Sequence, residues 1–208
     1  MNATKRTIPA WWRLQRADDC VIATAIHDGT LLRPEVEAAI ALDATTRLRE
    51  EDPFTGQAVA GVPTHVVPLR SRFEVDLNRA EDDAVYLRPE QSWGLRVWRA
   101  PPPGELVETS LRMHRAFYAM LAQLLDEVVA THGRFLLLDV RENVAFQGRG
   151  QLARFVHERY PVTGCSLAVE FKKFYMDEWT GEPDPVVLPA MRDFITHAAD
   201  AGRALLRG

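Results

Sequence analysis

The sequence predicts a three-layer α/β protein, in which a mixed, partly parallel sheet carries helices on both faces. Short apolar runs rich in β-branched residues alternate with segments of helical periodicity. The 208 residues are 47% hydrophobic and 26% charged, which is typical of a globular chain. No repeat, low-complexity stretch or interdomain linker interrupts the sequence, so we expect residues 1–208 to form one domain.

The first strand and helix are signalled near the N-terminus. The run Cys20–Ile26 (CVIATAI) is typical of a buried strand that ends at His27. Asp28-Gly29 signals a turn after this strand. Pro34 favours the start of a helix, because proline is suited to the first helical position, and we expect the helix to cover Glu35–Arg49.

Two further strands are expected in the next stretch. Thr64–Leu69 (THVVPL) reads as a strand, and Pro68 near its end favours a place at the edge of the sheet. Ser71–Asn78 (SRFEVDLN) alternates polar and apolar residues, which indicates a half-buried strand. The charged stretch from Arg79 to Gln91 is typical of a loop.

The second half of the chain begins with the longest predicted helix. Apolar residues recur at helical spacing over Glu105–His132, and Gly133 is a suitable stop signal. Phe135–Leu138 (FLLL) is then expected to be a strand that ends at Asp139. The remaining elements are a helix over Gln151–Arg159, a strand over Cys165–Phe171 and a closing amphipathic helix over Pro185–Leu206.

Charge and composition exclude several classes of function. The net charge is −4 with a pI of about 5.9 and no basic patch, which argues against a nucleic-acid partner. No run of about 18 apolar residues exists to span a membrane. Cys20 and Cys165 fit no metal-binding or disulfide spacing, and the N-terminus lacks the apolar core of a signal peptide, so we expect a cytoplasmic protein.

Three residues that could carry chemistry lie in or at the ends of predicted strands, where α/β proteins place their ligand sites. His27 ends the first strand, Asp139 ends the FLLL strand, and Glu170 lies within the last strand. Each has an ordinary alternative. His27 would then be a loop histidine, Asp139 would cap a turn, and Glu170 would form a structural ion pair with Lys172, Lys173 or an arginine.

An acidic run and a group of arginines are further candidates. Glu50-Glu51-Asp52 can supply metal ligands, or it can be a solvated helix end. Arg70, Arg72 and Arg79 bracket the predicted FEVDLN strand, and the planar fork of arginine suits a carboxylate, although plain surface charge is the alternative. Trp93 is assigned to hydrophobic packing at this stage.

Four motifs in order resemble the N-formylglutamate amidohydrolase family. They are Ala25–Gly29 (AIHDG), Arg49–Thr55 (REEDPFT), Arg70–Arg79 (RSRFEVDLNR) and Val169–Glu178 (VEFKKFYMDE). The arginine-rich VDLNR string is the most specific of them. The resemblance extends from about Cys20 to Pro185, which leaves residues 1–19 as an N-terminal extension.

This resemblance implies a fold and a chemistry similar to those of zinc carboxypeptidases. His27 would be a zinc ligand, with a second ligand from Glu51 or Asp52. Arg79, Asn78 and Arg72 would hold a substrate carboxylate. Glu170 would be the general base that activates a zinc-bound water for attack on an amide.

The sequence departs from the family pattern at the third zinc ligand. Family members usually carry an Asp-Leu-His-Ser string after the central strand, whereas here Asp139 runs into Val140-Arg141-Glu142. We interpret this as the loss of a segment of several dozen residues that includes the histidine. Asp139, Glu142 or His157 are the available substitutes, and we expect zinc binding to be weak or absent because catalytic zinc takes three protein ligands.

The resemblance predicts a metal-dependent amidohydrolase that acts on N-formylglutamate or a related N-acyl amino acid. The alternative is a degenerate relative that binds a small carboxylate without turnover. Both hypotheses predict that His27, Glu170 and Arg79 face one shared cleft at an edge of the sheet.

Overall fold

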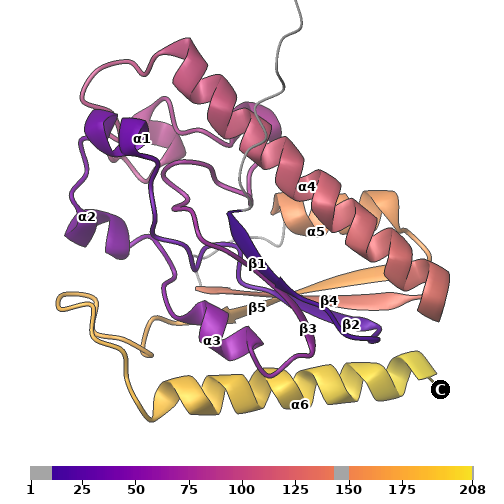
Figure 1. The fold of residues 1–208 in the computed structure, drawn as a ribbon. Coiled ribbons are helices and arrows are strands. Elements are labelled where there is room, and N and C mark those ends of the chain that lie inside the picture. Colours follow the sequence, from indigo (N-terminus) through magenta and orange to yellow (C-terminus); the bar gives the residue numbers. More distant parts are fainter. Residues whose placement is uncertain (1–10, 143–149, 208) are drawn as a thin grey trace, which may run out of the picture.

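A five-stranded mixed sheet lies at the centre of the molecule in the computed structural model, which describes residues 11–142 and 150–207 (Figure 1). The strand order is β1-β3-β2-β4-β5. Strands β3, β2, β4 and β5 are parallel, and β1 pairs with β3 in the antiparallel direction. The strands are β1 (Trp12–Gln15), β2 (Val21–Thr24), β3 (Thr64–Pro68), β4 (Phe135–Glu142) and β5 (Gly164–Phe171).

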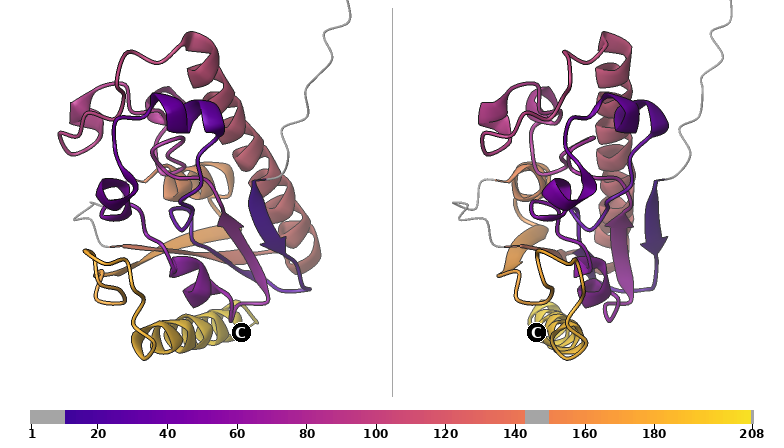
Figure 2. Two further views of the ribbon diagram at one scale, coloured as in Figure 1. Left: turned by 60° about the vertical axis from the view of Figure 1, so that its left-hand side comes forward. Right: turned by 90° about the vertical axis from the view of Figure 1, so that its left-hand side faces the viewer.

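Helices cover both faces of this sheet. The long helix α4 and the short α5 pack on one face, while α3 and α6 pack on the other (Figures 1 and 2). The α/β class and the helices on both faces are therefore confirmed. The helices are α1 (Pro34–Ala39), α2 (Ala44–Leu48), α3 (Thr55–Val59), α4 (Gly104–His132), α5 (Gln151–Arg159) and α6 (Val187–Arg207), with short 3₁₀ turns η1 (Glu81–Asp83) and η2 (Pro89–Gln91).

Strand β4 shows how the two hydrophobic cores share the sheet. Phe135 and Leu137 belong to the core under α4 and α5, whereas Leu136 and Leu138 belong to the core under α3 and α6. Successive side chains of a strand point to opposite faces, which explains why the first four residues of this strand, Phe135–Leu138, are all apolar. By the same alternation Asp139 and Arg141 lie on the α4 and α5 side.

The predicted helix Glu35–Arg49 is wrong as a single element, because it is two helices. Ile40 leaves α1 in extended conformation and forms a bridge with Trp98. Asp43 then caps α2, since its side chain accepts a hydrogen bond from Thr46 N. The long helix α4 agrees with the prediction and ends at Gly133.

The edge position expected for the strand that contains Pro68 is also wrong. Strand β3 lies between β1 and β2, but its ladder with β2 ends at Val66. Pro68 is paired only with Trp12 of β1, so its missing N–H does not interrupt the inner ladder. Strand β1 lies in the N-terminal region that the sequence left outside the family-like part.

The predicted strand Ser71–Asn78 is a buried stretch of turns instead. Every residue of this segment is buried, including the charged ones. Side chains satisfy backbone groups in place of a ladder: Ser71 Oγ accepts from Phe73 N at 3.1 Å, and Asp76 Oδ1 accepts from Asn78 N at 2.8 Å. The alternating pattern therefore marks a polar segment held inside the molecule.

Strand β4 is longer than predicted and continues to Glu142, so Asp139 lies within the strand and does not cap a turn. The short helix α3 was not predicted. Among the helices of residues 11–142 and 150–207, none has the length and apolar character needed to cross a membrane.

Candidate functional site

The carboxyl ends of three parallel strands and the segment that follows a fourth meet at one edge of the sheet and line a small cleft. His27 follows β2, Arg141 lies near the end of β4, and Glu170 lies near the end of β5. Arg141 and Glu170 are direct neighbours in the β4–β5 ladder. The lining residues are His27, Arg72, Asn78, Arg79, Trp93, Arg141, Glu142 and Glu170. His27, Glu170 and Arg79 thus line one cleft, as predicted.

His27 is buried between two carboxylates. Its Nε2 donates to Asp76 Oδ1 at 2.8 Å, and its Nδ1 lies 3.4 Å from Asp52 Oδ2. Burial and the nearby Arg72 act to lower the pKa of His27, but the carboxylates of Asp76 and Asp52 outweigh them and raise it above its ordinary value. His27 therefore lies in the turn after β2 as a buried residue that is coupled to two carboxylates.

Asp76 is the centre of the polar network, although it was not a predicted site residue. It accepts hydrogen bonds from His27, from Arg72 Nη2 at 3.0 Å, from Asn78 N and from the Tyr86 hydroxyl. Burial would raise the pKa of Asp76, but Arg72 and His27 hold it well below its ordinary value. Asp76 is thus a permanent anion that orients His27 and Arg72.

The adjacent acids Glu51 and Asp52 are both about 1% exposed, so the interpretation of this run as a solvated helix end is wrong. Asp52 turns toward His27, and its Oδ2 also accepts from Glu142 N at 3.0 Å. Glu51 turns away toward Ser71 and Arg47. Asp52 is therefore the acid placed beside His27, and Glu51 is not.

Asn78 and Arg79 follow directly from the buried segment. Asn78 O accepts from Gln151 N at 3.0 Å, which joins this segment to the start of α5. Arg79 is partly exposed at the rim, with its Nε 3.8 Å from Asp76 Oδ2. His114 of α4 donates to Arg79 O at 3.0 Å and so holds the main chain of the rim in place.

Glu170 and Arg141 face each other across the last ladder of the sheet. Arg141 Nη2 lies 3.5 Å from Glu170 Oε1, and Arg141 Nε lies 3.5 Å from Asp139 Oδ2. Burial raises the pKa of Asp139 to about 6. An ion pair with a lysine or an arginine was the alternative interpretation of Glu170, and its partner in the structure is Arg141, which was not selected from the sequence.

Trp93 was assigned to packing, yet its side chain is 40% exposed and lines the cleft. The Arg72 guanidinium lies over its ring, 4.7 Å from the centroid. Trp93 also has a positive φ of 54°, an uncommon conformation for a bulky residue. No spacing or motif in the sequence distinguishes it from the buried tryptophans.

Of the suggested substitute ligands, Glu142 lines the cleft and His157 does not. Glu142 pairs with Lys173 Nζ at 2.7 Å, and burial raises the pKa of Glu142 to about 7. His157 lies on α5, where its Nε2 accepts from Ser166 N at 3.2 Å. His157 is therefore engaged with β5, outside the cleft.

Comparison with known proteins identifies the family. The sequence model of the N-formylglutamate amidohydrolase family matches residues 19–166. The chain belongs to this family. The match includes His27, Asp52 and the Arg70–Arg79 motif, and it ends before Glu170.

The fold of this N-formylglutamate amidohydrolase family member is shared with a solved relative. It is similar to the crystal structure of N-formylglutamate amidohydrolase from Ralstonia eutropha JMP134, with a TM-score of 0.76 and 14% sequence identity. The similarity covers 93% of this chain and 98% of that chain. No curated protein matches the sequence.

The donor atoms of this family member fall short of a catalytic zinc site. The His27 Nδ1 and Asp52 Oδ2 pair, with Asp76 on the other ring nitrogen, resembles two metal ligands and their carboxylate support. Within residues 11–142 and 150–207, however, no three His, Cys, Asp or Glu residues are grouped to hold a metal ion. A catalytic zinc takes three protein ligands, and the side chain beside Asp139 is the cation Arg141. The donor set therefore does not fit this metal.

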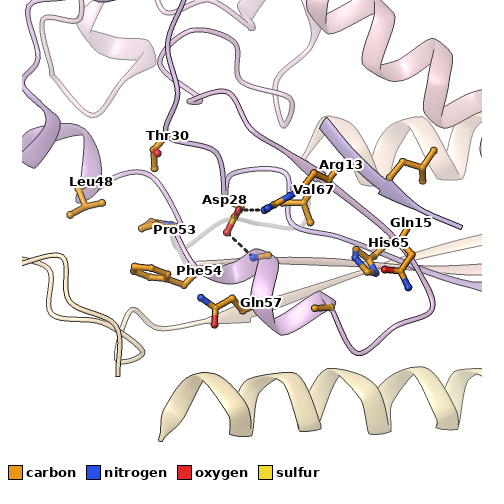
Figure 3. A pocket seen from close by; sticks show the side chains of 13 residues that line it. Arg13, Gln15, Asp28, Thr30, Leu48, Pro53, Phe54, Gln57, His65 and Val67 are labelled. Atoms are coloured by element: carbon orange, nitrogen blue, oxygen red, sulfur yellow. Dashed lines mark hydrogen bonds and ion pairs between the residues drawn. The ribbon is translucent and has the colours of Figure 1, made fainter. Parts of the chain in front are cut away.

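A larger hollow of about 820 Å³ lies beside β1 and α3 (Figure 3). Asp28 reaches into it, but its Oδ1 accepts from Gly56 N at 2.8 Å and its Oδ2 lies 3.9 Å from Arg13. Asp28 thus fixes the start of α3. The smaller cleft, which holds His27, three arginines and two glutamates, is the better candidate for a functional site.

Proposed function

We propose that this member of the N-formylglutamate amidohydrolase family binds a small carboxylate of the N-acyl amino acid class in the cleft. One observation carries the proposal: three guanidinium groups, from Arg72, Arg79 and Arg141, line it together with Asn78. They face the acids Glu142 and Glu170, so the lining carries an excess of positive charge. Arginine binds carboxylates through two parallel hydrogen bonds, which makes a carboxylate the fitting ligand.

The rim explains how such a ligand enters. The cleft volume is about 20 Å³, which holds roughly one water molecule. Arg79 and Trp93 are partly exposed at this rim, where Arg79 Nε lies 3.8 Å from Asp76 Oδ2 and the Trp93 ring packs under Arg72. We therefore expect a ligand to be taken up by a rearrangement of this rim, with Arg79 as its first contact.

Ligand-induced stabilisation tests the proposal. A ligand that binds only the native state raises the free energy of unfolding by about 2.7 kcal/mol at 100 times its Kd. We expect thermal unfolding to shift upward with N-formyl-L-glutamate and not with its neutral diamide. In Arg79→Gln, the apparent affinity derived from this thermal shift should be at least tenfold weaker than in wild type. Arg134→Gln, an exposed arginine at the opposite end of β4, is the matched control and should behave as wild type.

Equal shifts with the acid and the diamide, or an undiminished shift in Arg79→Gln, would contradict carboxylate binding in this cleft. The same measurements with N-acetyl-L-glutamate and with N-formylated amino acids of other side chains would identify the preferred member of the class.

Hydrolysis of the amide is the second candidate function. It is favoured by Glu170, whose side chain is 21% exposed on the cleft and is held 3.5 Å from Arg141, a suitable place for a base that activates water. The test is release of formate from N-formyl-L-glutamate, followed by NMR with and without added zinc. Turnover that disappears in Glu170→Gln would support hydrolysis, whereas binding without formate would leave carboxylate recognition as the function.

A further inference from the structure

We propose that Arg141 is the fixed cation at the centre of the cleft, that it binds the anionic group of the ligand directly, and that it replaces a metal ion there. This inference rests on the proposed carboxylate ligand. It gives a role to a residue that the sequence analysis did not select as a site residue, and it makes binding independent of metal.

The register of the sheet places Arg141 between the other functional residues. In the β2–β4 ladder Thr24 pairs with Asp139, so Arg141 is level with the residues that lead into His27. In the β4–β5 ladder Arg141 pairs with Glu170. Arg141 therefore lies between the ends of β2 and β5, on a strand that is paired on both of its sides.

The hydrogen-bonding capacity of Arg141 is left open although the side chain is only 4% exposed. Among the described residues, neither Nε nor Nη2 has a hydrogen-bond partner. Its contacts with Asp139 Oδ2 and Glu170 Oε1 are ion pairs, both at 3.5 Å. Buried polar atoms without partners are costly, and a carboxylate would satisfy two guanidinium N–H groups at once.

Of the other two arginines, Arg72 already uses both of its Nη atoms in hydrogen bonds within the protein, and Arg79 lies at the rim of the cleft. Arg72 donates through Nη1 to Glu50 O and through Nη2 to Asp76, and it also packs on Trp93. Arg79 lies at the rim with about a third of its side chain exposed. Arg141 is thus the guanidinium that is buried and still has two nitrogen atoms, Nε and Nη2, without a hydrogen-bond partner among the described residues.

The same position explains why the donor set does not suit a metal. His27 and Asp52 form a two-ligand pair, and a third donor would have to come from the neighbouring strand end, where Arg141 lies. A permanent positive charge at that place repels a divalent cation in a buried site of low dielectric. It also supplies the positive charge that an anionic ligand requires.

The first arm of the test measures zinc directly. After loading with zinc and desalting, elemental analysis should find less than about 0.1 zinc per chain in wild type and about one in Arg141→His, since histidine supplies a third donor. Zinc in the variant should disappear when His27→Ala is added, which separates the cleft from surface binding. Far-UV circular dichroism checks that each variant is folded, and Arg141→Cys, which also supplies a third donor, serves if Arg141→His does not fold.

The second arm measures ligand binding in the presence of EDTA. Stabilisation of wild type by N-formyl-L-glutamate should be unchanged by EDTA, lost in Arg141→Gln, partly kept in Arg141→Lys and unaffected in Arg134→Gln. Lysine keeps the charge but cannot form the fork, so a tenfold or larger weakening is expected.

The outcomes separate this inference from the proposed function. One zinc per wild-type chain, or a folded Arg141→His protein with no more zinc than wild type, would overturn the placement of Arg141. Stabilisation that requires zinc, or that survives in Arg141→Gln, would overturn its role as the anion anchor. If no carboxylate stabilises wild type, the proposed function fails, and the zinc arm still decides whether Arg141 stands in place of a metal.

Discussion

Glu51 and Asp52 are adjacent and equally buried, yet their surroundings shift their pKa values in opposite directions. The hydrogen bond and charge of His27, with Arg72 nearby, outweigh burial and hold the pKa of Asp52 below its ordinary value. Burial dominates at Glu51 and raises its pKa to about 7, although Ser71 and Arg47 oppose this rise. Asp52 is thus suited to a permanent charge in the cleft, and Glu51 to a structural role beneath it.

Replacing Glu51 should change how stability depends on pH. Because its folded pKa is raised above the unfolded value, the native state binds more protons between about pH 4.5 and 7. Its contribution therefore lowers the free energy of unfolding as pH rises through that window, by up to about 1.4 kcal/mol per pH unit. In Glu51→Gln this fall, measured by urea denaturation from pH 5 to 8, should be smaller by about 1–3 kcal/mol.

Asp139 and Glu142, whose pKa values are also raised, titrate in both proteins and cancel in the comparison. Glu37→Gln, an exposed glutamate of α1, is the control and should leave the profile of wild type. An unchanged profile in Glu51→Gln would show that Glu51 does not titrate in this window.

Sequence reasoning found most of the residues that line the cleft but not those that organise it. His27, Arg72, Asn78, Arg79 and Glu170 come from motifs or strand ends, and all five line it. Asp76 lies within the VDLNR motif, but its role, like those of Trp93 and Arg141, depends on contacts between segments that are distant in the chain. Their assignment required the register of β4 with β5 and the fold of the segment after β3.

At the scale of elements, the close approach of two loops positions the cleft. Gly29 follows His27 and lies against the main chain at Leu69 and Arg70, where the functional segment begins. A Cβ at Gly29 would be 2.3 Å from Leu69 C and 2.5 Å from Arg70 N. Both atoms belong to the backbone, so the contact cannot be relieved by a side-chain rotation.

Gly29→Ala should therefore displace the Arg70–Arg79 segment and destabilise the protein. We expect a loss of about 1–3 kcal/mol in the free energy of unfolding, as for other overpacked sites. Gly104→Ala is the matched control, because no atom lies within 4 Å of its Cβ at the start of α4. That change should stabilise the protein by about 0.4–1 kcal/mol. Chemical denaturation of both variants checks the contrast, which equal effects would refute.

The elements themselves were predictable where packing follows a simple period. The buried strands β2 and β4 and the helix α4 have continuous or helical apolar patterns, and each was found, as was the partly exposed edge strand β5. The strand prediction for Ser71–Asn78 is wrong because alternating polar and apolar residues were taken to mean that one face is in water. The polar side chains of this segment are instead buried and have hydrogen-bond partners. The predicted length of β4 was too short for a related reason. Asp139 and Arg141 are charged, but they lie inside a strand whose end lines the cleft.

At the scale of the whole molecule, two hydrophobic cores share a single sheet. Ile22 of β2 contributes to the core with α4, and Val21 contributes to the core with α6. Neither face can lose its helices without exposing strands that the other face needs. The cleft lies at the carboxyl edge of this shared sheet, so its geometry depends on both cores.

This sharing predicts that the protein unfolds as one cooperative unit. Ile195 of α6 is fully buried in the second core, and Ile195→Ala should lower the free energy of unfolding by about 2–5 kcal/mol. Trp11 packs near Phe117 of α4, with ring centroids 6.0 Å apart, so its fluorescence contributes a signal from the first core.

If the cores are coupled through the sheet, Ile195→Ala should shift the fluorescence and far-UV circular dichroism transitions by the same amount in urea. Leu205→Ala, a change at an 81% exposed position of the same helix, should stay within about 0.5 kcal/mol of wild type. An early loss of helical signal in Ile195→Ala, while fluorescence remains native, would mean that α6 unfolds alone. The carboxyl edge of the sheet, and with it the cleft, would then depend on the α4 face alone.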